Sequence, residues 1–540
     1  MRLLLVLAAC CSGCLAARVL GLFPTLSRSQ ATSFTSLMKG LAARGHQVTV
    51  VSAFPQPAPL ANYTDLDMNI DGDGLYAAVM KGLMARGGDR SWNPEIFRRT
   101  LSTLQMTAEM TDMALMNPAF QQLLKSSDSQ FDLVVLEAFA SDALLGFAHK
   151  YNASVVAFCP SAGYPWVLDS VGNPHPPSYV PSVFLRLDRG MSLWQRVVNS
   201  LLEVGLKLLR EWYLVPQQDR VMRKHFGHLE GLPHVSELQA RTSLLLLNSH
   251  AAFHPPVPLL PHVVPVGGLH LRPPGRLPKE LRRFMDGAQS GVVYCSLGAG
   301  LRSADLPARA RDALVRVFSR AKQRVLWKYE EALPDQPGNV KTGTWFPQQD
   351  VLAHPGLKVF VTSGGLLSLM EAADRGVPVL GLPVTLDQQL NLKRAREDGY
   401  AVTVDLANLT EHSLARALGR LLRNPRYRRA AQERSRLLRD QPLSPLERAV
   451  WWTEYALRHE GMPHLRSAVL HLGWAQSLLL DVAGLALGSG LLGVALAWHL
   501  LRRRLSVERR APTTTNTQSQ RDSSPSGLKK KGDDDRHNSQ

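Results

Sequence analysis

A glycine pair stands where an apolar run in the second half of the chain gives way to a helix-like pattern. The run Leu357–Thr362 has the composition of a buried strand, and Ser363, Gly364 and Gly365 follow it directly. Glycines at a strand–helix junction let backbone N–H groups approach a phosphate, and the N-terminus of the helix favours negative charge. The arrangement therefore predicts a binding site for a nucleotide diphosphate.

The next predicted strand, Pro378–Pro383, also leads into polar side chains. Asp387 and Gln388 follow it closely, at the start of another helical pattern. Carboxylate and amide groups accept and donate hydrogen bonds and are suited to pair with the hydroxyl groups of a sugar. The segment is therefore expected to hold a nucleotide that carries a sugar.

The stretch from Val340 to Asn391 resembles the signature segment of the UDP-glycosyltransferase family, which includes the membrane-bound UDP-glucuronosyltransferases and their invertebrate relatives. The family pattern is W-x-P-Q-x-D-x-L-x-H-P, then T-H-G-G, then E-x-x-x-x-G-V-P and D-Q-x-x-N. The positions that fit are Trp345, Pro347, Gln348, Asp350, His354, Pro355, Gly364, Gly365, Glu371, Gly376, Pro378, Asp387, Gln388 and Asn391. The amino-acid sequence of the segment is similar to that of arthropod members, for which UDP-glucose is the usual donor.

The resemblance implies which side chains hold the nucleoside and the sugar. Trp345 would stack on uracil, Gln348 would bond the edge of the base, and Glu371 would hold the ribose hydroxyls. Asp387 and Gln388 would bind hydroxyl groups of the sugar. The UDP-sugar is a co-substrate, and neither a cofactor nor a metal ion is expected.

The diphosphate would be held by hydroxyl and backbone donors at two turns. These are Ser296, Gly298, Gly364 and Gly365. Where the family has a histidine before the glycine pair, this chain has Ser363. A serine hydroxyl can donate one hydrogen bond, but it cannot supply the charge-assisted bond of an imidazolium.

Inverting sugar transfer needs a base that removes the proton of the acceptor hydroxyl. The family's base is a histidine near the N-terminus, and here Gln30 occupies that position. An amide has no useful basicity near neutral pH, so Gln30 cannot take the proton. The assisting acidic position falls on Glu137, with Asp142 about one helical turn further on. Glu137 would act as the base if burial raised its pKa; the alternative is a carboxylate that only caps the next helix.

Two hypotheses of different kinds follow. The first is a glucuronosyltransferase-like enzyme that transfers a hexose or hexuronic acid from a UDP-sugar to a hydroxyl of a small lipophilic acceptor, with inversion. The second is a catalytically impaired or silent family member that binds UDP-sugar or a lipophilic ligand, or assembles with active relatives. The second hypothesis is motivated by the loss of both family histidines, at Gln30 and Ser363. The family also has a serine where Ala299 stands, which is a third departure in the site.

Apolar strand-like runs alternate with helical patterns in both halves of the chain, which predicts parallel sheets covered by helices. The runs are 18–23, 47–52, 131–137, 154–158, 291–295, 324–329, 357–362 and 378–383. With the resemblance, they imply an α/β protein with two Rossmann-like domains facing a cleft, the GT-B glycosyltransferase fold. The expected boundaries are residues 18–252 for the acceptor-binding domain, 253–285 for a linker, and 286–475 for the UDP-sugar-binding domain with its returning helices.

Both ends of the chain carry targeting features. Residues 1–17 have an early arginine, an apolar stretch and small residues, which is the form of a cleaved signal peptide. Residues 482–501 lack formal charge and are long enough to span a bilayer as one C-terminal transmembrane helix, and three arginines follow. With the resemblance, this predicts a single-pass type I protein of the endoplasmic reticulum membrane, with a lumenal catalytic body and a disordered cytosolic tail over 502–540.

Charge and cysteine content exclude other classes. The 540 residues carry a net charge of +17, but the basic stretches lie in the tail and over 416–439, without an aromatic–basic motif for nucleic acid. A basic face is better explained by anionic lipid or a UDP-sugar. After signal cleavage only Cys159 and Cys295 remain, in different predicted domains, so buried unpaired thiols are expected rather than a disulfide framework. Homo- or hetero-oligomers with related transferases stay open.

Overall fold

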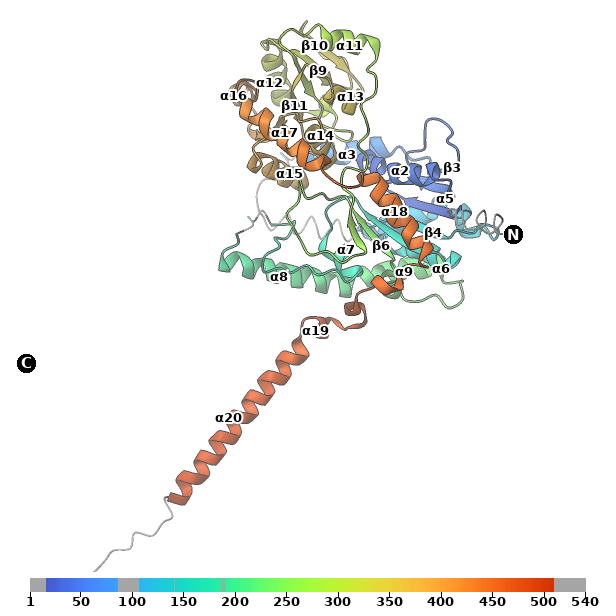
Figure 1. Ribbon diagram of the computed structural model, residues 1–540, viewed down its shortest axis with the longest axis vertical. Coiled ribbons are helices and arrows are strands. Elements are labelled where there is room, and N and C mark those ends of the chain that lie inside the picture. Colours follow the sequence, from blue (N-terminus) through green and yellow to red (C-terminus); the bar gives the residue numbers. More distant parts are fainter. Residues whose placement is uncertain (1–15, 86–105, 140, 186, 188–189, 509–540) are drawn as a thin grey trace, which may run out of the picture. The chain divides into compact units, whose positions relative to one another are not determined.

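The structure is a computed structural model that describes residues 16–85, 106–139, 141–185, 187 and 190–508 (Figure 1). The chain divides into two compact units, one ending at Leu470 and one beginning at His471. The first unit, called the body below, contains both sheets, and the second contains the long C-terminal helix. Residues 1–15 of the predicted signal peptide and 509–540 of the predicted tail lie outside the described residues.

The N-terminal domain is built on a sheet of seven parallel strands in the order β3-β2-β1-β4-β5-β6-β7. Successive side chains of its strands enter different cores: Leu20 and Leu22 pack on one face, Val19 and Phe23 on the other. A parallel sheet buried on both faces reads as a continuous apolar run, which is why these strands were visible in the sequence. The strands are β1 (Arg18–Phe23), β2 (Gln47–Ser52), β3 (Tyr63–Asp67), β4 (Leu133–Glu137), β5 (Ser154–Cys159), β6 (Leu244–Leu247) and β7 (Val263–Pro265).

Helices connect these strands. Helix α2 (Arg28–Ala43) begins five residues after β1 and buries its apolar side against the sheet. After β4 the chain forms a 3₁₀ turn, η1 (Asp142–Leu145), and then α6 (Gly146–Tyr151). The others are α3 (Gly72–Ala85), a helix over 106–116, α5 (Pro118–Lys125), α7 (Pro165–Ser170), α8 (Leu193–Leu209), the π-helical turn η2 (Arg210–Leu214), α9 (Val215–Phe226) and α10 (Val235–Ala240).

The C-terminal domain repeats this plan with six parallel strands in the order β10-β9-β8-β11-β12-β13. The strands are β8 (Val292–Cys295), β9 (Arg324–Lys328), β10 (Val340–Gly343), β11 (Leu357–Thr362), β12 (Val379–Gly381) and β13 (Ala401–Thr403). The helices are α11 (Lys279–Asp286), η3 (Ser303–Asp305), α12 (Ala308–Ser319), α13 (Gln348–Leu352), α14 (Leu366–Asp374), α15 (Leu386–Glu397), η4 (Leu406–Asn408), α16 (Glu411–Arg423) and α17 (Pro425–Arg439). Cys159 and Cys295 are free, buried thiols in different domains, as expected.

Two segments join the domains, and the first of them differs from the sequence expectation. The predicted linker, 253–285, contains β7, the edge strand of the first sheet, and most of α11. Helix α18 (Pro445–Arg458) follows the C-terminal domain but packs on α2 of the N-terminal domain. Gly40 permits this contact, because an added Cβ would lie 2.9 Å from Val450 Cγ2. An ion pair from Arg44 Nε to Glu454 Oε1, at 2.9 Å, lies beside it.

Helix α3 belongs to the N-terminal domain by sequence but packs on the C-terminal domain. Met80 is part of the C-terminal core, together with Leu297 and Leu301. Lys81 Nζ lies 3.0 Å from Asp305 Oδ1. This helix therefore closes one side of the space between the two domains.

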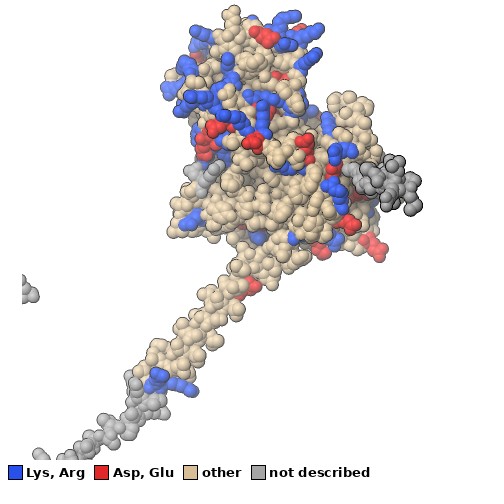
Figure 2. All heavy atoms as spheres, in the orientation of Figure 1, with Lys and Arg blue, Asp and Glu red and all other residues tan. Residues whose placement is uncertain are grey.

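The second unit carries α19 (Trp474–Ser477) and α20 (Leu480–Glu508). Within Leu480–Ser506, an 18-residue window of α20 has a mean hydropathy of 1.8, and none of that window is buried. Among the described residues it is the one helix long and apolar enough to cross a membrane. Figure 2 shows the charged side chains: lysine and arginine gather over the C-terminal domain, and the N-terminal domain is mostly uncharged in this view.

Candidate active site

A cleft of about 230 Å³ lies between the first turn of α2 and the C-terminal domain. In both sheets the strand order reverses between the first strand and its neighbour on the other side, at β1/β4 and at β8/β11. Ligands of such sheets bind outside the carboxyl ends of the strands at this switch point. Five of the predicted donor residues line the cleft: Ser296, Gly298, Trp345, Gln348 and Glu371.

Glu371 is the buried carboxylate of the cleft. It accepts hydrogen bonds from Gln348 Nε2 at 2.7 Å and Gln349 Nε2 at 3.4 Å, and His270 Nε2 lies 3.6 Å away. Burial raises the pKa of Glu371 to about 7, although the two glutamine bonds act in the opposite direction. A ligand hydroxyl that donates to this carboxylate would favour its ionised form.

Gln348 is held by protein groups on both sides of its amide. Its Nε2 donates to Glu371 and to Ser368 Oγ, and its Oε1 accepts from the hydroxyl of Tyr294 at 3.3 Å. The sequence predicted that this side chain bonds the edge of uracil. In the structure it orients Glu371, because both of its polar atoms already have protein partners.

Trp345 is 61% exposed and faces the cleft, as a stacking platform requires. The ammonium group of Lys328 lies 5.8 Å from the centroid of its ring. A large aromatic face left open to solvent at the wall of a cleft is suited to stack on a planar base.

The two glycines after β11 have different roles. Gly364 has φ +91°, and an added Cβ would overlap the side chain of Leu392. Gly365 has an ordinary φ of −58° and open space where a Cβ would stand. Gly365 also precedes α14, whose first N–H groups receive no side-chain cap. The turn therefore leaves uncapped donors and room beside them, which suits an anion.

The remaining predicted donor residues do not line the cleft. Ser363 is buried, and its hydroxyl donates to the carbonyl of Leu297 at 2.8 Å. This hydrogen bond links the turn after β11 to the turn after β8, so the hydroxyl proton is not directed at a ligand. Gln388 Oε1 accepts from the N–H groups of Val384 at 2.8 Å and of Thr385 at 3.2 Å, so Gln388 caps α15. The side chains of Ser363 and Gln388 thus support the local structure of the two turns.

Asp387 is exposed and accepts from the Thr385 hydroxyl at 2.5 Å. Its negative charge contributes to the raised pKa values of two tyrosines of the N-terminal domain. Burial, with a contribution from Asp387, raises the pKa of Tyr76 to about 12. Burial raises the pKa of Tyr164 as well, and the charges of Cys159, Asp387 and Glu137 add to the effect.

The predicted catalytic residues Glu137 and Gln30 are not among the residues that line the cleft. Glu137 ends β4 with a buried side chain, and no hydrogen bond or ion pair to its carboxylate occurs within the described part of the chain. Burial alone raises its pKa to about 8. Gln30, in the first turn of α2, accepts a 2.6 Å hydrogen bond from the Thr25 hydroxyl. The two predicted catalytic positions thus differ. Glu137 is a carboxyl with a pKa of about 8, and Gln30 is an amide held by a hydrogen bond from Thr25.

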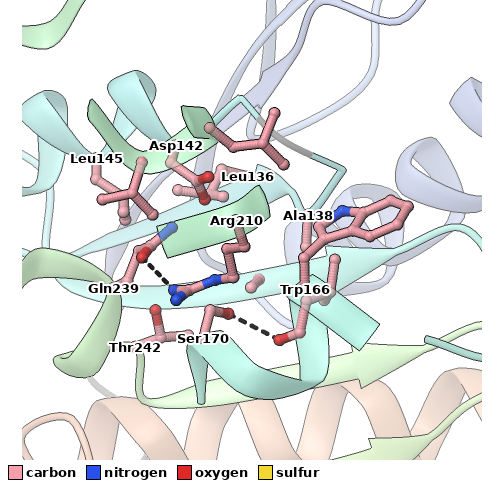
Figure 3. A pocket seen from close by; sticks show the side chains of 13 residues that line it. Leu136, Ala138, Asp142, Leu145, Trp166, Ser170, Arg210, Gln239 and Thr242 are labelled. Atoms are coloured by element: carbon pink, nitrogen blue, oxygen red, sulfur yellow. Dashed lines mark hydrogen bonds between the residues drawn. The ribbon is translucent and has the colours of Figure 1, made fainter. Parts of the chain in front are cut away.

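Asp142 lies elsewhere. It lines a small cavity of about 30 Å³ within the N-terminal domain, together with Trp166, Arg210 and Gln239 (Figure 3). Arg210 donates to Gln239 Oε1 at 2.7 Å. Burial raises the pKa of Asp142, while the hydrogen bond with Gln239 and the charge of Arg210 lower it. The sequence grouped Asp142 with the base; the structure assigns it to this separate cavity.

Residues 19–504 match the protein family described as UDP-glucoronosyl and UDP-glucosyl transferase. The chain belongs to this family. A relative in Dactylopius coccus, UDP-glycosyltransferase UGT5, is 34% identical over 86% of this chain and 88% of its own length. The ecdysteroid UDP-glucosyltransferase of Lymantria dispar multicapsid nuclear polyhedrosis virus is 33% identical over 92% and 97%. The human 2-hydroxyacylsphingosine 1-beta-galactosyltransferase is 32% identical over 89% and 88%.

Solved structures confirm the GT-B fold. Glycosyltransferase VinC, in complex with DTDP, aligns with a TM-score of 0.55 at 19% identity, over 81% of this chain and 100% of that one. A UDP-glucosyltransferase from Polygonum tinctorium aligns with a TM-score of 0.53 at 16% identity, over 82% and 99%. This UDP-glycosyltransferase therefore has two Rossmann-like domains of the GT-B type.

Three cations at the cleft of this UDP-glycosyltransferase were missed in the sequence. Arg28 is paired with Asp73 at 2.6 Å, Arg272 with Asp350 at 2.5 Å, and Lys328 with Glu330 at 2.6 Å. They come from the start of α2, the predicted linker and the end of β9. The sequence carried a partial signal for Lys328, since it is a lysine near the end of the predicted strand 324–329.

Proposed function

We propose that this protein transfers a hexose or hexuronic acid from a UDP-sugar to a hydroxyl of a small lipophilic acceptor, with inversion at the sugar carbon. The observation that carries the proposal is the cleft at the β8/β11 switch point. It combines an exposed tryptophan face, a buried carboxylate oriented by Gln348, and the uncapped start of α14. The tryptophan face suits the uracil ring, the buried carboxylate suits the ribose hydroxyls, and the start of α14 suits the diphosphate.

The cations at the cleft would offset part of the loss of the family histidine. When the bond between the sugar and UDP breaks, negative charge grows on the diphosphate. Arg28, Arg272 and Lys328 line the same cleft, so their charge would stabilise this leaving group. No metal ion is invoked in the reaction.

Glu137 is the group proposed to receive the acceptor's proton. The acceptor oxygen forms a bond to the sugar carbon, the bond to UDP breaks, and the hydroxyl proton passes to a base. Glu137 is half ionised near pH 8, because burial raises the pKa of its carboxyl to about that value. A base with a pKa near the working pH is effective in proton transfer.

The small lipophilic acceptor is inferred from relatives and not from a pocket. Two relatives are named for an ecdysteroid and for a 2-hydroxyacylsphingosine. Both are lipophilic alcohols. Relatives named as glucosyl, glucuronosyl and galactosyl transferases leave the sugar open.

A silent family member is the second candidate. It is favoured by Gln30, whose amide is no base, and by Ser363, whose proton is already donated to Leu297. Such a protein would bind a UDP-sugar or a lipophilic ligand without turnover, or assemble with active relatives.

Release of UDP by the full-length protein distinguishes the two candidates. UDP-glucose, UDP-glucuronic acid and UDP-galactose would each be offered with a panel of lipophilic alcohols and phenols. The enzyme proposal predicts acceptor-dependent UDP release with at least one pair, abolished by Glu137→Gln. Binding of UDP without any such release would support the silent member.

We also propose that α20 anchors the protein in the membrane of the endoplasmic reticulum, with the body in the lumen. The support is the apolar length of α20 and the arginines Arg502, Arg503 and Arg504 at its end, since flanking cations stay in the cytosol.

A further inference from the structure

His270 is a buried histidine in the segment that joins the two domains. It lies between β7 of the N-terminal sheet and α11 of the C-terminal domain, and its side chain is wholly buried. Within the part of the chain that the structure describes, neither ring nitrogen has a hydrogen-bond partner of normal geometry. Buried polar groups nearly always have a partner, so an imidazole without one calls for an explanation.

The carboxylate of Glu371 lies next to this ring. His270 Nε2 is 3.6 Å from Glu371 Oε1, slightly beyond the range of a hydrogen bond. The two oxygens of Glu371 differ in their partners. Oε2 accepts a 2.7 Å bond from Gln348, whereas the bond that Oε1 accepts from Gln349 is long, at 3.4 Å. Oε1 therefore has the capacity to accept a second, shorter hydrogen bond.

Gln349 holds the backbone around His270 in place. Its Nε2 donates to the carbonyl of His270 at 3.1 Å, and its Oε1 accepts from the N–H of Arg272 at 3.0 Å. The same amide nitrogen donates to Glu371 Oε1. One side chain thus holds the connecting segment beside Glu371, so a small movement of the imidazole or of the carboxylate is enough to complete the bond between them.

Two arginines influence Glu371 by their charge but direct their hydrogen bonds elsewhere. The charges of Arg272 and Arg375 lower the pKa of Glu371, against the larger effect of burial. Arg272 donates to both oxygens of Asp350, at 2.8 and 2.5 Å. Arg375 donates to the carbonyl of Arg272 at 2.6 Å. This leaves the imidazole of His270 as the candidate donor for Oε1.

We propose that His270 is a positioning residue for ribose recognition, because its Nε2–H donates to Glu371 Oε1 once the ribose hydroxyls have bound this carboxylate. The inference rests on the proposed function, in which Glu371 holds those hydroxyls. Hydroxyl donors favour the ionised carboxylate, and hydrogen bonds to an ionised oxygen are shorter and stronger. His270 does not line the cleft, so it would fix the side chain of Glu371 from the interior of the protein.

The protonation of the ring fits this role. Burial lowers the pKa of His270 to about 4, although the backbone of Leu367 and the charge of Asp374 act in the opposite direction. The ring is therefore neutral near pH 7 and carries one N–H. With this proton on Nε2, His270 donates a hydrogen bond to Glu371 without placing a second buried charge beside it.

Nucleotides with and without ribose hydroxyls test the proposal. Full-length protein in detergent would be titrated calorimetrically with UDP and with 2′,3′-dideoxy-UDP, which lacks both hydroxyls that Glu371 would bind. His270→Leu removes both ring nitrogens, and the amide of His270→Asn is too short to take the place of Nε2. The amide nitrogen of His270→Gln can reach about as far as the imidazole Nε2, so this variant keeps the donor.

Wild-type protein should bind UDP more tightly than the dideoxy nucleotide. His270→Leu and His270→Asn should raise the Kd for UDP about fivefold or more and leave the Kd for dideoxy-UDP unchanged. His270→Gln should keep the wild-type preference. His262→Leu is the matched control, because His262 is also a buried histidine with an unpartnered Nδ1 but does not line the cleft. It should change neither affinity.

A wild-type preference for UDP in a folded His270→Leu or His270→Asn protein would overturn the proposal. So would an equal loss of affinity for both nucleotides, which would indicate general damage to the cleft, or a His270→Gln protein that loses the preference as His270→Leu does. If wild-type protein binds both nucleotides equally, Glu371 does not hold the ribose and the proposal fails with it. Acceptor-dependent release of UDP reports separately on the proposed transfer reaction.

Discussion

At the scale of single residues, burial is what makes a carboxyl useful here. Glu137 and Glu371 are both buried carboxyls with pKa values raised toward neutrality, to about 8 and about 7. They differ in their partners: two glutamines donate to Glu371, whereas Glu137 is affected by burial alone. The first arrangement suits a fixed hydrogen-bond acceptor for a ligand, and the second suits a proton acceptor.

The pH dependence of transfer should report Glu137. Its folded pKa lies above the ordinary value of 4.5, so the neutral form predominates below about pH 8 and the ionised base above it. The rate of UDP release should therefore rise with pH and level off above about pH 8. Glu137→Gln should remove this step and most of the activity. A rising limb that persists in Glu137→Gln would place the base elsewhere.

The same pKa gives an independent check in the stability of the fold. The folded state holds the Glu137 proton between about pH 4.5 and pH 8, where the unfolded state has lost it. The stability contributed by this group is therefore present below pH 4.5 and is lost as pH rises through about 8. Chemical denaturation should show that Glu137→Gln is more stable than the wild type at pH 8, but not at pH 4.

Gln30 should limit the rate. A histidine at this position would restore a general base, and such assistance is typically worth about 10²–10⁴-fold. Gln30→His should therefore raise turnover of at least one phenolic acceptor. Gln30→Asn, which keeps an amide, is the matched control and should not raise it. If Gln30→His folds and binds UDP but stays inert, more than the base has been lost, and the silent-member candidate gains.

At the scale of elements, the turn between β11 and α14 separates folding from binding. Gly364 is needed for its positive φ and for the close approach of Leu392, whereas Gly365 has neither constraint. Two neighbouring glycines with the same sequence signature thus serve different purposes. This distinction was invisible in the sequence, because it depends on how α15 packs against the turn.

Alanine at each position tests this separation. Gly364→Ala should lower the free energy of unfolding by about 1–3 kcal/mol, since it adds both a strained φ and an overlap with Leu392. Gly365→Ala should leave stability within about 0.5 kcal/mol, because its Cβ enters open space. Gly365→Ala should instead weaken UDP binding, since the new methyl group stands beside the first N–H groups of α14. Unchanged affinity in Gly365→Ala would show that the diphosphate lies elsewhere.

At the scale of the whole molecule, the sequence predicted the features that depend on a short stretch of consecutive residues. Strands β1, β2 and β11 were predicted to the residue, because a buried parallel strand is a continuous apolar run with polar or glycine ends. The signature residues Trp345, Gln348 and Glu371 were found because they lie within one local segment. The cations Arg28 and Arg272 were not, since they are brought to the cleft from distant parts of the chain. The edge strand β7 was missed because it has only three residues, inside a proline-rich stretch.

The orientation in the membrane is also a property of the whole chain. Protease added to sealed microsomes should remove only the segment after Arg504, because the arginines after α20 are expected in the cytosol and the body in the lumen. Immunodetection with antibodies against the body and against the tail would follow both parts. Digestion of the body without detergent would contradict this topology.

The central claim is that the cleft between the two domains binds a UDP-sugar through Glu371 and the turns around it. Calorimetric titration of the detergent-purified, full-length protein with UDP tests it most directly. Wild-type protein should give saturable binding, weakened by roughly 1–2 kcal/mol by the missing histidine but not abolished. Glu371→Gln should raise the Kd about tenfold or more, as expected for loss of a charged acceptor for the ribose hydroxyls. Absence of binding to folded wild-type protein at millimolar UDP, or equal affinity in Glu371→Gln, would contradict the account.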